Sequence, residues 1–218
     1  VIGTCGTCGT NNMVDWMFDM TRSIAKELKQ KVQVARIYCE KNTEQLKEAL
    51  SSGKVFPLEP APDIDQRKID TFTHIVSLAG AEPFQDALNT GADIILAGRS
   101  TGTAIISALP LMRGENPGAC WHGAKIAECG AFCSSNPSSG VILLEVDKNG
   151  FTVEAMAKEA FCTPRSVSAH MLYENADPFS LHEPGGTLEV KEASYKSLDE
   201  RRVRVIGSKW MPSSNYKV

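Results

Sequence analysis

Up to residue 133 the chain alternates between short apolar runs and amphipathic helical segments, and this alternation limits its fold more than any other feature. β-Branched, apolar runs at residues 32–39, 74–79 and 93–97 are typical of buried strands. The segment 12–31, which precedes the first of these runs, has apolar residues at helical spacing, from Met13 and Trp16 to Ile24 and Leu28. Strands that alternate with helices predict a parallel, doubly wound sheet.

The pattern changes after the loop at residues 134–140. Two apolar runs flank Asp147-Lys148-Asn149-Gly150, and an Asn-Gly turn in that context predicts a β-hairpin. The fold class is therefore predicted to be α/β, with a doubly wound, mostly parallel sheet followed by a smaller hairpin-rich β region. We expect an α/β ligand-binding core at 1–140 and a β-rich region packed on it at 141–218.

Composition excludes several classes of protein. Lysine and arginine number 23 and aspartate and glutamate 26, and this balance argues against a nucleic-acid partner. No apolar run reaches the roughly 18–20 residues of a membrane-spanning helix, so no membrane partner is expected. The seven cysteines are an odd number with no signal peptide before them, which favours reduced thiols and a cytoplasmic location. Since Val1 opens inside a strand-like run, we expect the chain to be a portion of a longer protein.

A first glycine loop, at residues 3–12, follows a strand and opens a helix. Free amides at a helix N-terminus attract phosphate or carboxylate, and glycine lets the backbone approach a ligand. The loop has neither the Rossmann nor the Walker spacing. The candidate anion-binding residues are Gly3, Thr4, Gly6, Thr7, Gly9 and Thr10. The alternative is a glycine-rich turn capped by threonines.

Three further segments share this anion-binding character. Arg99, Ser100 and Thr101 lie between a predicted strand and helix, and the guanidinium adds a bidentate donor for carboxylate or phosphate. Glu82 follows another predicted strand, and the segment 162–170 contributes Arg165 and His170. The alternatives are an internal salt bridge for Arg99, helix capping for Glu82 and a solvent-exposed Arg165.

The segment 119–133 is predicted to be a helix of mostly small and apolar residues that holds four reactive ones. These candidate catalytic residues, His122, Lys125, Glu128 and Cys129, share one helical face. A buried lysine must be paired and is suited to acid–base chemistry, and a nearby lysine favours a thiolate. The alternative is a Lys125–Glu128 pair at the surface with Cys129 as a small core residue. No metal site is predicted, because Cys5-x-x-Cys8 has no second pair at suitable spacing.

Several long motifs resemble the acyclic terpene utilisation AtuA family. They are GADIILAGRSTGTAIISALPLMRGENPGACWHGAKIAECGAFC (91–133), CTPRSVSAHMLYENADPF (162–179) and HEPGGTLEVKEASYKSLDERRVRVIGSKW (182–210), with IGTCGTCGTNN and AGAEPF before them. The resemblance implies a role in the catabolism of branched acyclic terpenoid acids through acyl-CoA intermediates. It also implies that the natural protein is longer. Relatives are expected to carry small residues where this chain has the cysteines of the first glycine loop.

Three functional hypotheses follow. The sequence favours an enzyme that acts on a small-molecule carboxylate or CoA thioester by lyase or hydratase chemistry, but it does not settle whether the chain is an enzyme. The first alternative is a non-catalytic ligand-binding module or complex subunit, and the second is an iron–sulfur dehydratase. No cofactor is assigned apart from the CoA moiety of such a substrate. A homo-oligomer, or a complex with the remaining protein segments, is expected.

Overall fold

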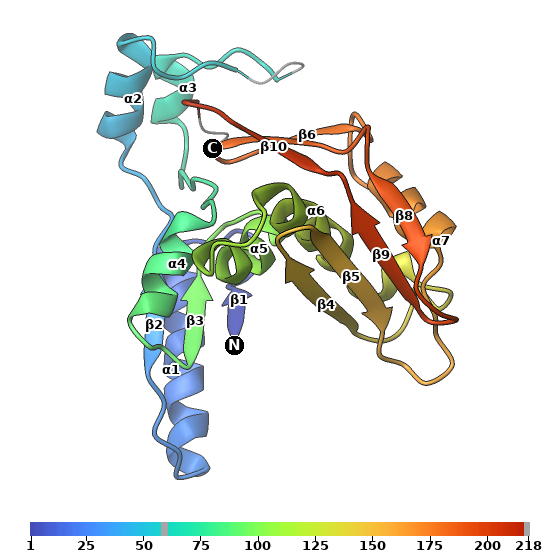
Figure 1. The fold of residues 1–218 in the computed structure, drawn as a ribbon. Coiled ribbons are helices and arrows are strands. Elements are labelled where there is room, and N and C mark those ends of the chain that lie inside the picture. The colour runs from blue at the N-terminus through green and yellow to red at the C-terminus, as the bar shows by residue number, and fades with distance from the viewer. Residues whose placement is uncertain (58–60, 216–218) are drawn as a thin grey trace. The chain divides into compact units, whose positions relative to one another are not determined.

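The computed structural model describes residues 1–57 and 61–215, which form two compact units (Figure 1). Unit 1 comprises Val1–Leu78 and Ala92–Arg99, and unit 2 comprises Ala79–Gly91 and Ser100–Val218. The end of the predicted β-rich region, residues 216–218, lies outside the described residues. The division at residue 140 stays a prediction about folding domains.

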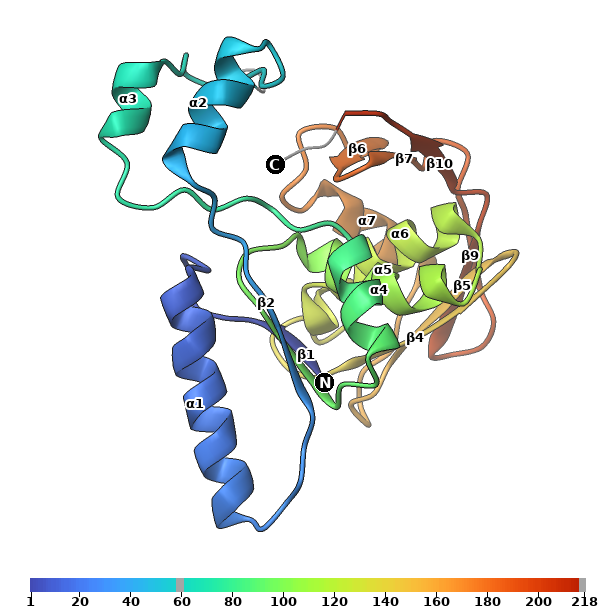
Figure 2. The ribbon, with the colours of Figure 1, turned by 90° about the vertical axis from the view of Figure 1, so that its left-hand side faces the viewer.

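Unit 1 is built on a parallel sheet of three strands in the order β1-β3-β2. The strands are β1 (Ile2–Thr4), β2 (Val34–Ile37) and β3 (Ile94–Ala97). Helix α1 (Asn11–Glu27) runs beside this sheet (Figure 2) and buries Val14 against Cys5 and Leu96. Two shorter helices, α2 (Thr43–Ser51) and α3 (Gln66–Asp70), pack on each other.

The outer face of α1 leaves large apolar side chains in solvent. Trp16, Met20 and Ile24 are exposed and follow one another at intervals of four residues, so they form one ridge along the helix. An exposed apolar ridge does not by itself establish self-association, so the expected homo-oligomer stays a prediction.

Residues 74–79 are not the strand that their apolar character predicts. Within the described residues, their ladder pairing consists of two isolated bridges, an antiparallel one between Val76 and Glu40 and a parallel one between Ala79 and Ser100. The backbone amides of Lys41 and Ser77 donate to the carbonyls of Ile75 and Cys39. The described residues 74–79 therefore pair with the chain just beyond the end of β2 but do not form a continuous strand.

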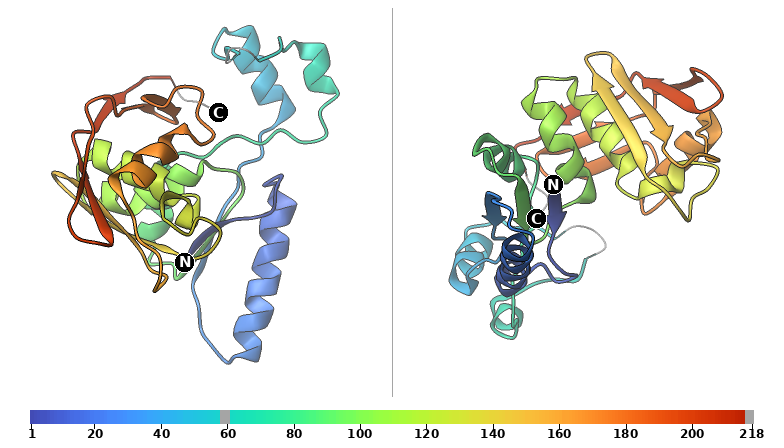
Figure 3. Two further views of the ribbon diagram at one scale, coloured as in Figure 1. Left: turned by 90° about the vertical axis from the view of Figure 1, so that its right-hand side faces the viewer. Right: turned by 90° about the horizontal axis from the view of Figure 1, so that it is seen from below.

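Unit 2 combines helices with two antiparallel sheets, ordered β4-β5-β9-β8 and β10-β7-β6 (Figure 3). Its helices are α4 (Glu82–Asn89), α5 (Gly102–Met112), α6 (Pro117–Ala127), η1 (Gly130–Cys133), α7 (Pro164–Ala169) and η2 (His170–Leu172). Its strands are β4 (Ile142–Asp147), β5 (Gly150–Ala155), β6 (Ser180–Glu183), β7 (Gly186–Glu189), β8 (Ser194–Ser197), β9 (Arg202–Ile206) and β10 (Lys209–Pro212). The predicted mixed α/β class, with a parallel sheet and a hairpin-rich β region, is confirmed.

The predicted hairpin at residues 147–150 is confirmed. Strands β4 and β5 pair in register from Ile142–Ala155 to Asp147–Gly150, so Lys148 and Asn149 form the turn. The Asp147 carboxylate accepts hydrogen bonds from the amides of Asn149 and Gly150. A short polar side chain that bonds to the backbone ahead of it is a strong turn former.

Helix α6 is the centre of unit 2. It packs against β4 and β5 of one sheet and β7 and β10 of the other, and every residue from Gly118 to Ile126 is buried. This environment explains its small residues: a Cβ at Gly123 would lie 3.0 Å from Leu144. The helix ends at Ala127, with Gly130 at φ 60° in the turn that follows. The predicted helix to residue 133 is therefore too long, and Cys129 lies outside it.

We predict that Gly118→Ala lowers the free energy of unfolding by about 1–3 kcal/mol. A Cβ there would lie 2.3 Å from the Ser208 carbonyl oxygen, so helix and backbone must separate. Urea unfolding followed by circular dichroism measures the change. Gly3→Ala is the control, because nothing lies within 4 Å of its added Cβ. Equal stability of the Gly118→Ala variant and the wild type would contradict the close approach.

Candidate functional site

Lys125 and Glu128 form an ion pair that is buried in unit 2. The ammonium contacts the Glu128 Oε1 atom, and the two side chains are only 6% and 12% exposed. The interpretation of this pair as a surface pair is therefore wrong. Removing two charges from water is expensive, and their mutual attraction offsets this cost only with good geometry and further hydrogen bonds.

Those further hydrogen bonds come from helix α5. The Thr103 hydroxyl lies 3.0 Å from Glu128 Oε2 and 2.8 Å from Glu183 Oε1. A hydroxyl has one proton, so it donates to one of these carboxyl groups at a time. The carboxyl of Glu128 also lies against Gly102, where an added Cβ would be 2.8 Å from its Oε2 atom. Two carboxyl groups thus meet at the positive N-terminal end of α5.

His170 borders the same group of side chains. It is buried, and burial lowers its pKa, with the Lys125 charge acting in the same direction and Glu128 in the opposite one. The ring is thus neutral at neutral pH. Within residues 1–57 and 61–215, its buried Nε2 atom has no hydrogen-bond partner. We call Lys125, Glu128, Thr103, Glu183 and His170 the Lys125 cluster.

Cys129 adjoins this cluster as a thiol. Burial raises its pKa, the nearby Glu128 raises it further, and Lys125 has a smaller opposing effect. A thiolate is the reactive form of cysteine. The electrostatics therefore do not favour Cys129 as an activated nucleophile.

His122 occupies a separate, fully buried place on α6. Its Nδ1 atom lies 2.7 Å from the Ser208 hydroxyl and its Nε2 atom 3.1 Å from the Tyr195 hydroxyl. The ring also meets Phe151 edge-on. Burial lowers the pKa of His122 to about 3, so the imidazole is neutral. It connects α6 to the antiparallel strands through two hydroxyl groups.

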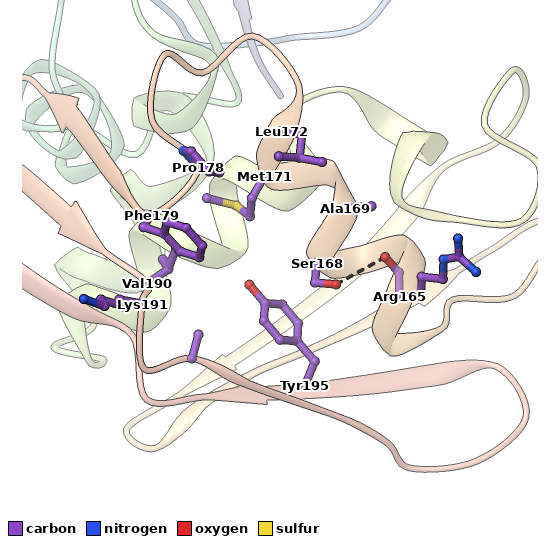
Figure 4. Close-up of a pocket in the computed structure, with 11 residues that line it drawn as sticks. Arg165, Ser168, Ala169, Met171, Leu172, Pro178, Phe179, Val190, Lys191 and Tyr195 are labelled. Carbon is purple, nitrogen blue, oxygen red and sulfur yellow. Dashed lines mark hydrogen bonds between the residues drawn. The ribbon is translucent and has the colours of Figure 1, made fainter.

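Arg165 lies on α7, whose N-cap residue is Thr163. Thr163 and Ser166 form a reciprocal capping box there. Arg165 lines a pocket of about 310 Å³ in unit 2 (Figure 4). The other lining residues are Ser168, Ala169, Met171, Leu172, Pro178, Phe179, Val190, Lys191, Ala193 and Tyr195.

The first glycine loop holds a carboxylate that belongs to the chain. The Asn11 amide, at the start of α1, donates to Glu40 Oε2 over 2.7 Å, and His74 Nδ1 lies 2.6 Å from Glu40 Oε1. These two hydrogen bonds lower the pKa of Glu40. Gly9 has φ 63° and packs on Arg99, where an added Cβ would be 2.8 Å from the Arg99 amide. The Arg99 guanidinium donates to the Thr7 carbonyl over 3.4 Å.

The candidate residues in two loops, the one that follows β3 and the one that leads into α4, have local structural roles. Thr101 caps α5 by accepting a hydrogen bond from the Ala104 amide. The Ser100 hydroxyl is buried and has no partner within the described residues. Glu82 opens α4, and its carboxylate lies over Gly80. A ligand role for the anion-binding candidates in both units stays a prediction.

The model of the acyclic terpene utilisation family protein AtuA matches residues 6–218 of the chain. The chain belongs to the AtuA family. The predicted membership is thus confirmed, and it associates the chain with the utilisation of acyclic terpenes. No curated protein and no solved structure matches this AtuA family member.

Three acid or hydroxyl groups of this AtuA family member were not predicted. Glu40 follows β2, so the rule that ligands collect at the carboxyl ends of parallel strands could have found it. Glu183 and Thr103 lie 80 residues apart, and no local pattern signals their contact.

Metal-ligating side chains do not gather in the described part of this AtuA family member. Within residues 1–57 and 61–215, no three histidine, cysteine, aspartate or glutamate residues are grouped so that they could hold a metal ion. These residues therefore offer no ligand set for the iron–sulfur hypothesis. Among the helices of the same residues, none has the length and apolar character needed to cross a lipid bilayer.

Proposed function

We propose that this AtuA family member is an enzyme that moves a proton on a carboxylate or acyl thioester during the catabolism of branched acyclic acids. The observation that carries the proposal is the Lys125 cluster, in which two carboxyl groups share the Thr103 hydroxyl beside a buried ammonium. Ionisable groups gathered in a buried place are typical of functional sites. The family's association with acyclic terpenes supports the branched substrate class.

The cluster suits lyase or hydratase chemistry. Such reactions remove a proton next to a carbonyl group and stabilise the negative charge that develops on its oxygen. Glu128 or Glu183 would accept the proton, with Thr103 between them. Lys125 would stabilise the developing oxyanion, and its charge acts strongly because the pair is shielded from water.

A second candidate is a non-catalytic ligand-binding module or complex subunit. It is favoured by the way Lys125, Glu128 and Thr103 satisfy one another without a ligand. In this case the cluster would stabilise the junction of α5, α6 and β6.

Deuterium exchange separates the two candidates. We expect the protein to incorporate deuterium next to the carbonyl of a branched-chain acyl-CoA thioester or free acid in D₂O. Glu128→Gln should slow incorporation at least about 100-fold, since a positioned proton-transfer group contributes roughly 10²–10⁴-fold. Mass spectrometry of the recovered compound measures the rate.

The matched control is Glu192→Gln, which changes an exposed glutamate paired with Lys209. This variant should exchange at the wild-type rate. An unchanged rate in the Glu128→Gln variant would refute the role of Glu128. Binding without exchange in the wild type would favour the ligand-binding module.

A further inference from the structure

The pocket on unit 2 is lined mostly by apolar side chains and has a cationic residue at each end. Eleven described residues line it, of which two are cationic, Arg165 and Lys191, and none is acidic. The whole chain has a net charge of −3, so this bias is local. A volume of about 310 Å³ lies at the lower end of the roughly 300–1,000 Å³ of small-molecule sites.

The apolar walls are partly open to solvent. Met171 and Val190 are buried, whereas Phe179 and Leu172 are 55% and 69% exposed. Large apolar side chains grouped at the mouth of a pocket mark binding sites, because a ligand removes them from water. A ligand with an aliphatic chain would cover these side chains.

One polar group faces this apolar space. Figure 4 shows the hydroxyl of Tyr195 directed towards the side chains of Met171 and Phe179. That hydroxyl is held by His122, 3.1 Å away, and His122 is held in turn by Ser208. When Ser208 donates to Nδ1, the Nε2–H group donates to the Tyr195 oxygen. The tyrosine proton is then available for a carbonyl oxygen.

We propose that this pocket binds the chain of an aliphatic acyl compound that carries a negative charge. The chain would lie against Met171, Phe179 and Val190, and its carbonyl oxygen would accept a hydrogen bond from Tyr195. Arg165 would hold the anionic group, since its guanidinium matches a carboxylate or phosphate in a bidentate way. Lys191 lies at the opposite end of the pocket (Figure 4) and serves as the matched control. This inference deepens the proposed function by naming where its substrate chain binds.

Calorimetry with the full chain tests the pocket without turnover. Hexanoate, octanoate and decanoate are titrated, and each added methylene should tighten binding about fourfold. Decanamide keeps the carbonyl group but lacks the charge. Arg165→Gln should weaken decanoate at least about fivefold and leave decanamide unchanged, whereas Lys191→Gln should have less than half of that effect.

Two variants test the walls and the polar anchor. Ala193→Trp should fill the pocket and weaken decanoate at least about tenfold, and Phe179→Ser, at an exposed side chain that the fold tolerates, should weaken it about fivefold. Tyr195→Phe should weaken decanoate and decanamide alike. Affinity that does not depend on chain length, or decanoate binding unchanged in both the Ala193→Trp and Phe179→Ser variants, would overturn the inference.

The outcome is separable from that of the proposed function. Glu192→Gln, at an exposed glutamate outside both sites, should bind decanoate as the wild type does. Deuterium exchange without chain-length-dependent binding would refute the pocket and keep the proposed function. Chain-length-dependent binding without deuterium exchange would refute the proposed function and keep the pocket.

Discussion

Lys125→Met is expected to destabilise unit 2 by about 3–5 kcal/mol. The substitution preserves most of the side-chain volume but leaves Glu128 as a buried carboxylate without its counter-charge, and removal of one partner of a buried pair has a cost of that size. The stacked Trp121 and Trp210 rings, 4.6 Å apart, report on the unfolding of unit 2. A Trp16→Phe background removes the signal of unit 1, so urea unfolding followed by fluorescence isolates the effect.

The double variant is the matched control. Lys125→Met combined with Glu128→Leu removes both charges, and replacement of a buried ion pair by apolar residues is often nearly neutral. We therefore expect the double variant to recover most of the lost stability, with a coupling energy of at least about 2 kcal/mol. Additive effects of the two substitutions, or a Lys125→Met variant within about 0.5 kcal/mol of the wild type, would contradict a buried pair.

Protonation of His122 at acid pH is expected to lower the free energy of unfolding by up to about 4 kcal/mol. Its folded pKa is about 3, below the 6.5 of an exposed histidine, because burial penalises the charged ring. The unfolded chain therefore binds this proton first. The stabilisation is complete above pH 6.5 and is lost as the pH falls towards 3, at about 1.4 kcal/mol per pH unit. The lowered pKa of His170 acts in the same direction.

The window from pH 6.5 to 5 is the cleanest test of His122. His122 should account for a loss of about 1–2 kcal/mol there. Carboxyl groups with lowered pKa values, such as Asp147 and Asp199, lose their contribution mainly at lower pH. His122→Gln retains a donor and an acceptor but does not titrate, so its stability should fall less over this window. Urea unfolding at several pH values measures both slopes, and identical slopes would refute the buried, neutral His122.

Local patterns in the sequence predicted much of this fold because they depend on nearby residues. The strand before the first glycine loop, the amphipathic helix after it and the Asn149-Gly150 hairpin are in the structure. The pairing of Lys125 with Glu128 also follows from spacing, since residues three apart share a helical face. Fold class and family were thus accessible from the sequence.

The residues that surround the candidate site could not be predicted from the sequence, because they depend on contacts between distant positions. Nothing near Lys125 indicates that Glu183 and Thr103 complete its cluster. Likewise, His122 meets Tyr195 and Ser208 at separations of 73 and 86 residues. A helix that is buried on all sides has no apolar face, so periodicity could not show which side of α6 each reactive residue occupies.

The carboxyl groups of Glu40 and Glu128 occupy the N-terminal ends of α1 and α5, where a dissolved anion would otherwise bind. Glu40 is attached to the same folded unit as the Asn11 amide that it contacts, and Glu128 is attached to the same folded unit as the Thr103 hydroxyl. An attached group acts at an effective concentration on the order of millimolar even when its tether is flexible. A free carboxylate or phosphate must compete with that local concentration before it reaches either helix. A ligand with additional binding energy elsewhere, such as an apolar chain, would compete better for either helix start.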